Sequence, residues 1–333
     1  MSTRFTHTSV AGASGSSARR SDHRPAAGSI TVLPEGRASV FTEAVGEAGG
    51  DVVPLGPDTK AIVWLANDDP SSLLTALDEN PQVQWVQLPW AGVDAFADVL
   101  RDRSRDDLLW TSAKGAYAQP VAEHALTLLL ASLRSLGARA RATSWGEKSG
   151  ESLYGRNVVI VGAGGIAVEL IRLLEPFGVN VTIVRRSDAP VEGADRTVPA
   201  GELDSVLPEA DAIVIAAAAT SETRSMFGAG QFALLKPTAV LVNIARGPLV
   251  DTDALTVALR EGRLYAAGLD VTDPEPLPDG HPLWSEERVI ITPHSADTPD
   301  MIAPLLAERI RHNVAAYLGG GEFDGVVDPT RGY

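Results

Sequence analysis

The strongest constraint on the fold is an apolar run that leads into a cluster of glycines. Val158–Val161 has the character of a buried strand, and a helical pattern up to Leu174 follows Gly162-Ala163-Gly164-Gly165-Ile166-Ala167. This order fits G-x-G-x-x-G/A, in which the first glycine permits a tight turn and the second lets the backbone approach a pyrophosphate. The helix that begins there offers unpaired N–H groups to phosphates. The pattern predicts a dinucleotide site with the cofactor-binding residues Gly162, Gly164, Gly165 and Ile166.

Short apolar runs alternate with helical patterns on both sides of this unit. Four strands are expected in the first part of the chain: Ile30–Leu33, Ala61–Leu65, Trp85–Leu88 and Leu108–Thr111. Six are expected in the second: Asn157–Val161, Val181–Val184, Ala212–Ala217, Ala239–Asn243, Ala266–Asp270 and Val289–Thr292. A long helix begins near Pro120 between the two series, and a last helix is expected over Ala303–Leu318. Strands that alternate with helices pair in parallel, so the fold class is α/β with doubly wound parallel sheets. This context favours the dinucleotide site over a glycine-rich turn without a ligand.

Composition and charge exclude several classes of function. The 333 residues carry a net charge of −15, whereas nucleic acids and anionic membranes require a basic surface. The absence of cysteine rules out disulfides, a thiolate nucleophile and zinc–sulfur or iron–sulfur centres. No histidine spacing typical of a metal site occurs, so no metal is expected. No apolar run approaches the roughly 18 residues needed to cross a bilayer.

The first 29 residues differ in composition from the rest of the chain. They are rich in Ser, Gly and Ala, contain several arginines and lack an apolar signal-peptide core. We expect a solvated tail and a cytoplasmic protein, with an organelle transit peptide as the alternative.

The choice of cofactor depends on the end of the second strand of the dinucleotide unit. NAD-binding sites usually place Asp or Glu there to bond the ribose hydroxyls. Here the strand ends in Arg185-Arg186-Ser187. Two guanidinium groups and a hydroxyl suit a 2′-phosphate, because arginine binds phosphate bidentately. The sequence therefore predicts NADP(H) in preference to NAD(H), and a solvated basic turn is the alternative.

Four polar residues accompany the last three expected strands. Arg246, Asp270 and His294 each follow or end one of these strands, and Glu275 comes shortly after Asp270. Ligands bind at the carboxyl ends of the strands in an open parallel sheet, so these side chains are expected to converge. Arginine can hold a substrate carboxylate, and histidine can give a proton to a keto oxygen or take one from an alcohol. Glu275, if hydrogen-bonded to His294, would orient its ring and favour the imidazolium form.

With these residues the chain resembles the D-isomer-specific 2-hydroxyacid dehydrogenases, and within them glyoxylate/hydroxypyruvate reductases. The likeness rests on the glycine loop and on Pro120–Leu130, Val242–Asp251, Gly268–Pro278, Thr292–Ala296 and Val326-Val327-Asp328. It implies hydride transfer between a nicotinamide cofactor and a small 2-keto or 2-hydroxy acid, with Arg246, Glu275 and His294 as the catalytic residues. It also implies the cofactor-binding residues Thr220, Ala245 and Asp270, and a substrate carboxylate bound by the backbone of Ala91, Gly92 and Val93.

The resemblance also implies an arrangement of domains. A substrate-binding domain would comprise residues 30–118 and 297–333, and a dinucleotide-binding domain residues 119–296. Both would be Rossmann-like, with the active site in a cleft between them that closes to exclude water. Members of the family are commonly homodimers with the helix after Pro120 at the interface. Trp145 would either reach towards the partner or pack on its own chain.

Several residues bear on the substrate and on alternative functions. The Leu65–Asp69 stretch has no Lys or Arg to bind a phosphate ester, which favours an unphosphorylated 2-keto acid. Trp90 and the absence of proline from Ala216–Ala219 depart from the family pattern, so the substrate pocket and the nicotinamide-facing loop are expected to differ. A formate- or phosphite-type dehydrogenase is an alternative, although formate enzymes of this superfamily pair the histidine with glutamine rather than with a residue such as Glu275.

A non-catalytic nucleotide-sensing protein is a further alternative. Such a protein would be expected to have lost a member of the catalytic trio, and all three are present. His124 lies within the apolar pattern of the long helix, so we interpret it as a buried, hydrogen-bonded residue rather than a catalytic one.

Overall fold

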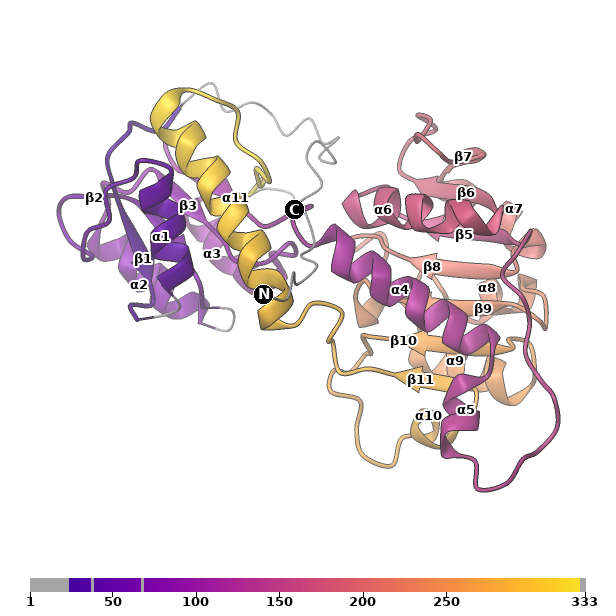
Figure 1. Ribbon diagram of the computed structural model, residues 1–333. Coiled ribbons are helices and arrows are strands. Elements are labelled where there is room, and N and C mark those ends of the chain that lie inside the picture. Colours follow the sequence, from indigo (N-terminus) through magenta and orange to yellow (C-terminus); the bar gives the residue numbers. More distant parts are fainter. Residues whose placement is uncertain (1–23, 37–38, 67–68, 330–333) are drawn as a thin grey trace, which may run out of the picture. The chain divides into compact units, whose positions relative to one another are not determined.

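The structure is a computed structural model that describes residues 24–36, 39–66 and 69–329 (Figure 1). The chain divides into two compact units. Unit 1 comprises Met1–Tyr117 and Thr298–Tyr333, and unit 2 comprises Ala118–Asp297. Most of the tail expected over residues 1–29, and residues 67 and 68 of the stretch that lacks Lys and Arg, lie outside the described residues.

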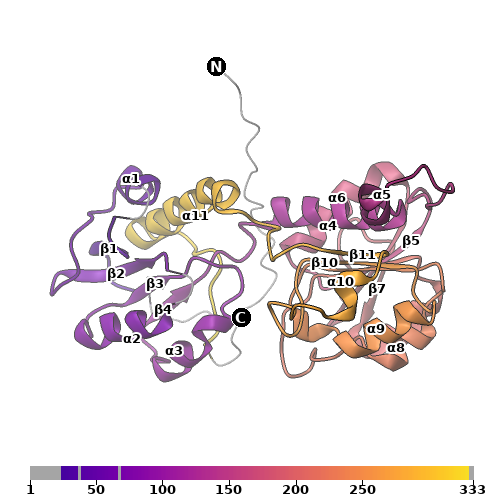
Figure 2. The same cartoon turned by 90° about the horizontal axis from the view of Figure 1, so that it is seen from below.

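Unit 1 is built on a four-stranded parallel sheet with the order β1-β2-β3-β4. The strands are β1 (Ser29–Leu33), β2 (Thr59–Trp64), β3 (Trp85–Gln87) and β4 (Leu109–Thr111). The helices are α1 (Ser39–Glu47), α2 (Pro70–Glu79), α3 (Ala97–Asp102) and α11 (Pro299–Gly319). Figure 2 shows α1 and α11 on one face of this sheet and α2 and α3 on the other. On the second face, Leu73 of α2 and Leu100 of α3 share a buried apolar cluster with Ile62 of the sheet.

Unit 2 is built on a seven-stranded parallel sheet with the order β11-β10-β9-β8-β5-β6-β7. The strands are β5 (Asn157–Val161), β6 (Asn180–Arg185), β7 (Arg196–Pro199), β8 (Ala212–Ile215), β9 (Val240–Asn243), β10 (Ala266–Leu269) and β11 (Val289–Ile291). The helices are α4 (Ala118–Leu133), α5 (Leu136–Arg141), α6 (Gly165–Leu174), α7 (Leu203–Val206), α8 (Ala229–Leu234), α9 (Thr252–Arg260) and α10 (Pro282–Ser285). Figure 2 shows α4 and α6 on one face of this sheet and α8 and α9 on the other. The second face packs in a buried apolar cluster that includes Leu255 and Leu259 of α9.

The α/β fold class with two Rossmann-like parallel sheets is confirmed. All ten expected strands are present, and their ends differ from the expected ones by two residues at most. The strand interiors of unit 2 are almost continuously buried, which is why apolar runs located them. In the described part of the chain, no helix is both long enough and apolar enough to cross a membrane.

The elements of unit 2 that the sequence did not predict include β7 and α5. β7 buries only Val198, so no apolar run marks it. Helix α5 lies partly in Gly137–Gly150, which reads as a polar break after the long helix, and it contains no buried residue. Ser135 precedes it with a left-handed φ of 53°, so the chain leaves α4, turns and resumes as an exposed helix.

Candidate active site

Three neighbouring strands of unit 2 end at the same edge of the sheet. β9, β10 and β11 lie side by side, and their last residues, Asn243, Leu269 and Ile291, are register partners across the two strand pairs. The chain therefore leaves all three strands at one level. Arg246, Asp270 and His294 follow in the next one to three residues.

Glu275 and His294 are in direct contact in this region. Glu275 Oε1 lies 2.7 Å from His294 Nδ1. An ionised carboxylate can only accept, so Nδ1 carries the hydrogen of this bond and Nε2 is left to meet another group. The two side chains are 42% and 43% exposed, which makes the ring accessible to a small molecule. The pair has the arrangement of an acid/base histidine whose ring is oriented by a carboxylate.

Arg246 lies in a loop whose backbone is fixed by Asn243. The Asn243 Oδ1 atom accepts from the Ala245 N–H at 3.1 Å, and its Nδ2 donates to the Arg246 carbonyl oxygen at 2.9 Å. A Cβ atom at Gly247 would lie 1.8 Å from the carbonyl oxygen of Thr272, so the glycine allows this loop to pack against the loop that leads to Glu275. The guanidinium donates from Nη1 to the Ala245 carbonyl oxygen at 2.8 Å.

Asp270 is buried, with 2% of its surface exposed, and its carboxylate is bonded by several donors. Thr292 Oγ1 lies 2.5 Å from Oδ1, and the N–H groups of Ser295 and Ala296 donate to Oδ1 and Oδ2 at 2.9 and 3.1 Å. His124 Nε2 lies 3.3 Å from Oδ1. Burial acts to raise the pKa of Asp270, but these hydrogen bonds, that of His124 foremost, hold the pKa below its ordinary value. The carboxylate therefore stabilises unit 2 at neutral pH, and this contribution is lost only as the pH falls through the lowered folded-state pKa.

His124 of α4 is hydrogen-bonded, as predicted from the sequence, but it is half-buried rather than buried. Its side chain is 19% exposed, and Nε2 lies 2.9 Å from Thr292 Oγ1. The sequence did not indicate which residues it would meet, because its partners are more than a hundred positions further along the chain.

Asp297 is a titratable residue of this region that the sequence interpretation did not single out. Burial raises its pKa to about 6, and the charges of His294 and Arg246 oppose this while that of Asp270 adds to it. The charges of all three residues that follow β9, β10 and β11 therefore act on the Asp297 carboxyl group. It changes charge near pH 6, so the region becomes less negative on mild acidification. Only its position close after His294 marks it in the sequence.

The glycine loop between β5 and α6 has the geometry that a dinucleotide requires. Gly162 has a φ of +116°, and a Cβ atom there would lie 2.5 Å from the Ala216 carbonyl oxygen. At Gly164 a Cβ atom would meet nothing within 4 Å, so the space in front of the backbone is open. No side chain caps the first turn of α6, whose N–H groups are therefore available to phosphate oxygens. Ala167 is fully buried where the helix packs on the sheet. These residues fit a bound dinucleotide.

The residues predicted to bind the 2′-phosphate of the cofactor lie beside this loop. The Gly162 N–H donates to the Val184 carbonyl oxygen at 2.8 Å, which joins the loop to the end of β6. Arg185 is half-buried there, and Arg186 and Ser187 are exposed. Of the other predicted cofactor-binding residues, Thr220 lies in the loop after β8, where its N–H donates to Thr223 Oγ1 at 2.8 Å.

The predicted substrate-binding stretch belongs to unit 1. Ala91 is exposed, Gly92 half-buried and Val93 buried, in the loop that follows β3. The preceding Trp90 accepts a hydrogen bond at its carbonyl oxygen from the Ala113 N–H at 2.9 Å, and its ring packs edge-on against Tyr117 at 6.1 Å. These contacts fix the backbone that leads into the stretch.

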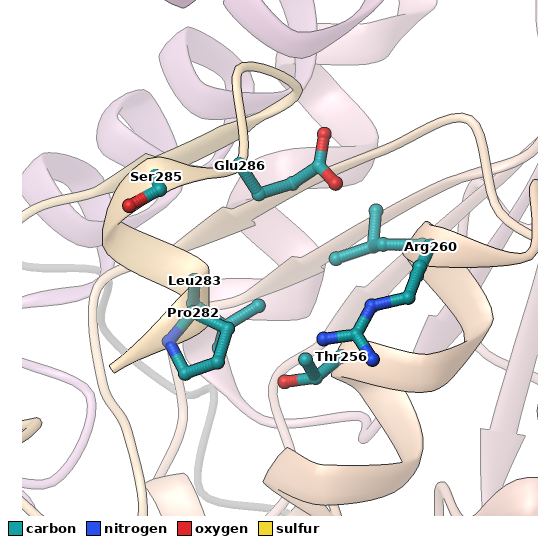
Figure 3. A pocket seen from close by; sticks show the side chains of 7 residues that line it. Thr256, Arg260, Pro282, Leu283, Ser285 and Glu286 are labelled. Atoms are coloured by element: carbon teal, nitrogen blue, oxygen red, sulfur yellow. The ribbon is translucent and has the colours of Figure 1, made fainter. Parts of the chain in front are cut away.

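Two cavities of unit 2 lie away from the predicted site residues. One, of about 140 Å³, lies between α9 and α10 (Figure 3) and is lined by Thr256, Leu259, Arg260, Pro282, Leu283, Ser285 and Glu286. The other, of about 250 Å³, is lined by residues of α8 and α9 and their surroundings, including Phe232 and Val257. Among the described residues, no group of three or more His, Cys, Asp or Glu side chains is placed to hold a metal ion.

Comparison with known proteins gives the family. The family model described as D-isomer specific 2-hydroxyacid dehydrogenase, NAD binding domain, matches residues 125–296, slightly more than half of the chain. The chain belongs to this family. As a D-2-hydroxyacid dehydrogenase it is an oxidoreductase with an NAD(P)-binding domain, and that domain contains both the glycine loop and the Glu275–His294 pair.

Three proteins illustrate the similarity of this dehydrogenase to known ones. It is 40% identical over 265 residues to a Corynebacterium melassecola protein described as uncharacterized, in the proB 3′ region, covering 77% of this chain and 85% of that one. It is 31% identical over 271 residues to glyoxylate/hydroxypyruvate reductase B of Shigella boydii, covering 78% and 77%. Its structure is similar, with a TM-score of 0.78 and 27% identity over 92% and 100% of the chains, to a D-isomer specific 2-hydroxyacid dehydrogenase from Xanthobacter autotrophicus Py2 in complex with NADPH and MES.

Proposed function

We propose that this dehydrogenase uses NADP(H) to interconvert a small, unphosphorylated 2-keto acid and its D-2-hydroxy acid. The observation that carries the proposal is the 2.7 Å contact between Glu275 and His294, at the sheet edge from which Arg246 also projects. Glyoxylate and hydroxypyruvate are the favoured substrates, supported by the name of the Shigella boydii relative.

The residues of the chain perform complementary tasks in this reaction. Arg246 binds the substrate carboxylate in a forked geometry and orients the adjacent keto group. A reduced nicotinamide, when bound, supplies the hydride that the keto carbon accepts. The imidazolium form of His294, held at Nδ1 by Glu275, donates its Nε2 proton to the keto oxygen, so that a hydroxyl group forms and the ring is left in the Nδ1–H form. In the reverse direction Nε2 removes this proton from the hydroxyl.

The remaining assignments belong to the same proposal. Unit 2 holds the nucleotide through Gly162, Gly164, Gly165, Ile166, Thr220, Ala245 and Asp270. Unit 1 contributes the backbone of Ala91, Gly92 and Val93 to the substrate carboxylate. Arg185, Arg186 and Ser187 bind the 2′-phosphate of NADPH, a role supported by their place at the end of β6 and by the NADPH in the Xanthobacter structure. Cytoplasmic location stays a prediction, to be tested by cell fractionation.

The activity is tested with a panel of 2-keto acids and both reduced cofactors. We expect glyoxylate or hydroxypyruvate to be reduced, and kcat/KM to be higher with NADPH than with NADH, because two arginines can meet the extra phosphate. Arg185→Ala is expected to lower kcat/KM with NADPH roughly 10- to 100-fold, which corresponds to one charge-assisted hydrogen bond, and to leave the NADH reaction nearly unchanged. The measurement is the loss of absorbance of the reduced nicotinamide.

Two results of this panel would contradict the proposal. Equal or better use of NADH by the unchanged protein would remove the cofactor preference. Oxidation of formate or phosphite without reduction of any 2-keto acid would place the enzyme with the alternative class.

Homodimer formation is proposed from the exposed apolar residues of the α5 region. Trp145 is 95% exposed and Leu136 is 52% exposed. The structure therefore does not support the reading that Trp145 packs on its own chain.

The dimer is tested by measuring the mass of the protein in solution. A tryptophan so exposed is more stable when another surface covers it. Light scattering should therefore give about twice the 35.0 kDa mass of one chain. Trp145→Ala should shift the protein towards monomer, whereas Leu318→Ala, an exposed apolar position of unit 1, should not. A monomeric unchanged protein would refute the dimer.

A further inference from the structure

We propose that His124 of α4 is a positioning residue that holds the loop of His294 in place through Asp270 and Thr292. The proposal rests on the function proposed above, since it assigns to His294 the proton transfer. It concerns a second histidine, which reaches the site from a helix on one face of the sheet and does not itself touch the Glu275–His294 pair.

The direction of the hydrogen bonds identifies His124 as a donor. Asp270, whose pKa is lowered, is ionised at neutral pH and can only accept. Thr292 Oγ1, 2.5 Å away, must therefore give its single hydrogen to Asp270 Oδ1. His124 Nε2 lies 2.9 Å from the same Thr292 oxygen, which has no hydrogen left to offer. The hydrogen between them consequently lies on Nε2, and His124 donates both to Thr292 and towards Asp270 Oδ1 at 3.3 Å.

The buried carboxylate in turn fixes the backbone around the catalytic ring. The Asp270 carbonyl oxygen accepts from the His294 N–H at 2.8 Å, and the carboxylate oxygens accept from the N–H groups of Ser295 and Ala296. Together with Thr292, one aspartate thus holds the chain on both sides of His294. This restraint matters because His294 has a left-handed φ of 49°, a conformation that a non-glycine residue keeps only when its surroundings enforce it.

His124 supplies the part of this arrangement that the loop itself cannot provide. Thr292, Ser295 and Ala296 move with the loop, whereas His124 belongs to α4, which packs against β9, β10 and β11. Without the imidazole, Thr292 Oγ1 loses its donor and the buried carboxylate loses a partner from outside the loop. The other charged groups of this region are Arg246, Glu275, which is bonded to His294, and Asp297. The expected consequence is a His294 ring that no longer stays aligned with Glu275.

Three variants separate this role from a contribution to stability alone. His124→Phe keeps a ring of similar size without a donor, and His124→Gln restores an N–H near the position of Nε2. Thr127→Ala is the matched control on the same helix, because Thr127 is exposed and bonds only to the Glu123 carbonyl oxygen. We expect His124→Phe to lower kcat about 10- to 100-fold, the effect of a small misplacement of a catalytic group, with little change in KM for NADPH. His124→Gln should recover most of kcat, and Thr127→Ala should match the unchanged protein.

A spectroscopic measurement on the protein without substrate or cofactor tests the same idea independently of activity. In ¹⁵N NMR spectra of the histidine rings, His124 should be in the Nε2–H form and His294 in the Nδ1–H form, and the sequence has only six histidines to assign. In His124→Phe the His294 signals should change towards a mixture of both forms, while Thr127→Ala leaves them as they are.

The outcomes distinguish this inference from the proposed function. Three results would each overturn the positioning role. The first is a hydrogen on Nδ1 instead of Nε2 of His124, and the second is an unchanged set of His294 signals in His124→Phe. The third is an equal loss of kcat in the Phe and Gln variants that parallels the fall in their melting temperatures. Failure of the unchanged protein to reduce any 2-keto acid would instead refute the proposed function. The NMR signals of the histidine rings would then still show whether His124 positions the ring of His294. If His124→Phe does not fold, the Gln variant and the tautomer of His124 in the unchanged protein provide the test.

Discussion

Replacing His294 by alanine is expected to lower kcat for 2-keto acid reduction by about 10²- to 10⁴-fold, the usual contribution of a positioned acid or base. The keto oxygen then has no proton donor at the place where Nε2 stands, because Glu275 contacts the opposite side of the ring at Nδ1. NADPH affinity should stay nearly unchanged, since the glycine loop and the end of β6 do not include His294. Steady-state rates and NADPH fluorescence titration measure the two quantities.

Two further variants make this test specific. His312→Ala removes an exposed histidine of α11 and should leave kcat unchanged. Glu275→Gln keeps the size of the side chain and should cause a smaller loss than His294→Ala, because the ring remains and only the carboxylate that accepts from Nδ1 is replaced by an amide. If His294→Ala retained full kcat, the proton would have to come from another group. Binding of NADPH without any turnover by the unchanged protein would support the nucleotide-sensing alternative.

The strands and the location of the candidate site could be predicted from the sequence because their signals are local. A buried parallel strand is a short apolar run, as in Val158–Val161, and glycines such as Gly162 mark backbone conformations that other residues adopt with strain. Polar residues at the carboxyl ends of strands then indicate where side chains gather. The 2.7 Å contact of Glu275 with His294 agrees with this reasoning, although the two residues come from different loops.

The partners of Asp270 could not be predicted, for a physical reason. They depend on the register between β10 and β11 and on the angle at which α4 crosses the sheet, and neither is encoded in a short pattern. His124 shows this clearly, because its apolar neighbours indicated a buried position but not the carboxylate it meets. β7 and α5 were missed because β7 buries only Val198 and α5 buries no residue, so that burial left no pattern in their sequences.

Replacing Arg246 by alanine is expected to lower kcat/KM for the 2-keto acid by about 10²- to 10⁴-fold. A forked guanidinium–carboxylate contact consists of two charge-assisted hydrogen bonds, each contributing about 1.5–3 kcal/mol, and tenfold in rate corresponds to roughly 1.4 kcal/mol. Arg246→Lys should lose a substantial part of this effect, because an ammonium keeps the charge but cannot form the fork. The loop itself should survive the substitution, since Asn243 bonds to the backbone rather than to the side chain of Arg246.

The charge recognition can be separated from other effects by changing the substrate together with the enzyme. An amide or ester of the same keto acid has no carboxylate, so its already low kcat/KM should fall much less in Arg246→Ala than that of the acid does. Added guanidinium ions should partly restore reduction of the acid by Arg246→Ala. They should not restore it in Arg246→Lys, because the lysine side chain still occupies the space of the missing guanidinium group. Arg260→Ala, at the exposed end of α9, is the matched control and should behave as the unchanged protein. An equal loss for the acid and its amide would mean that Arg246 acts on the loop or the keto group and that the carboxylate is bound elsewhere.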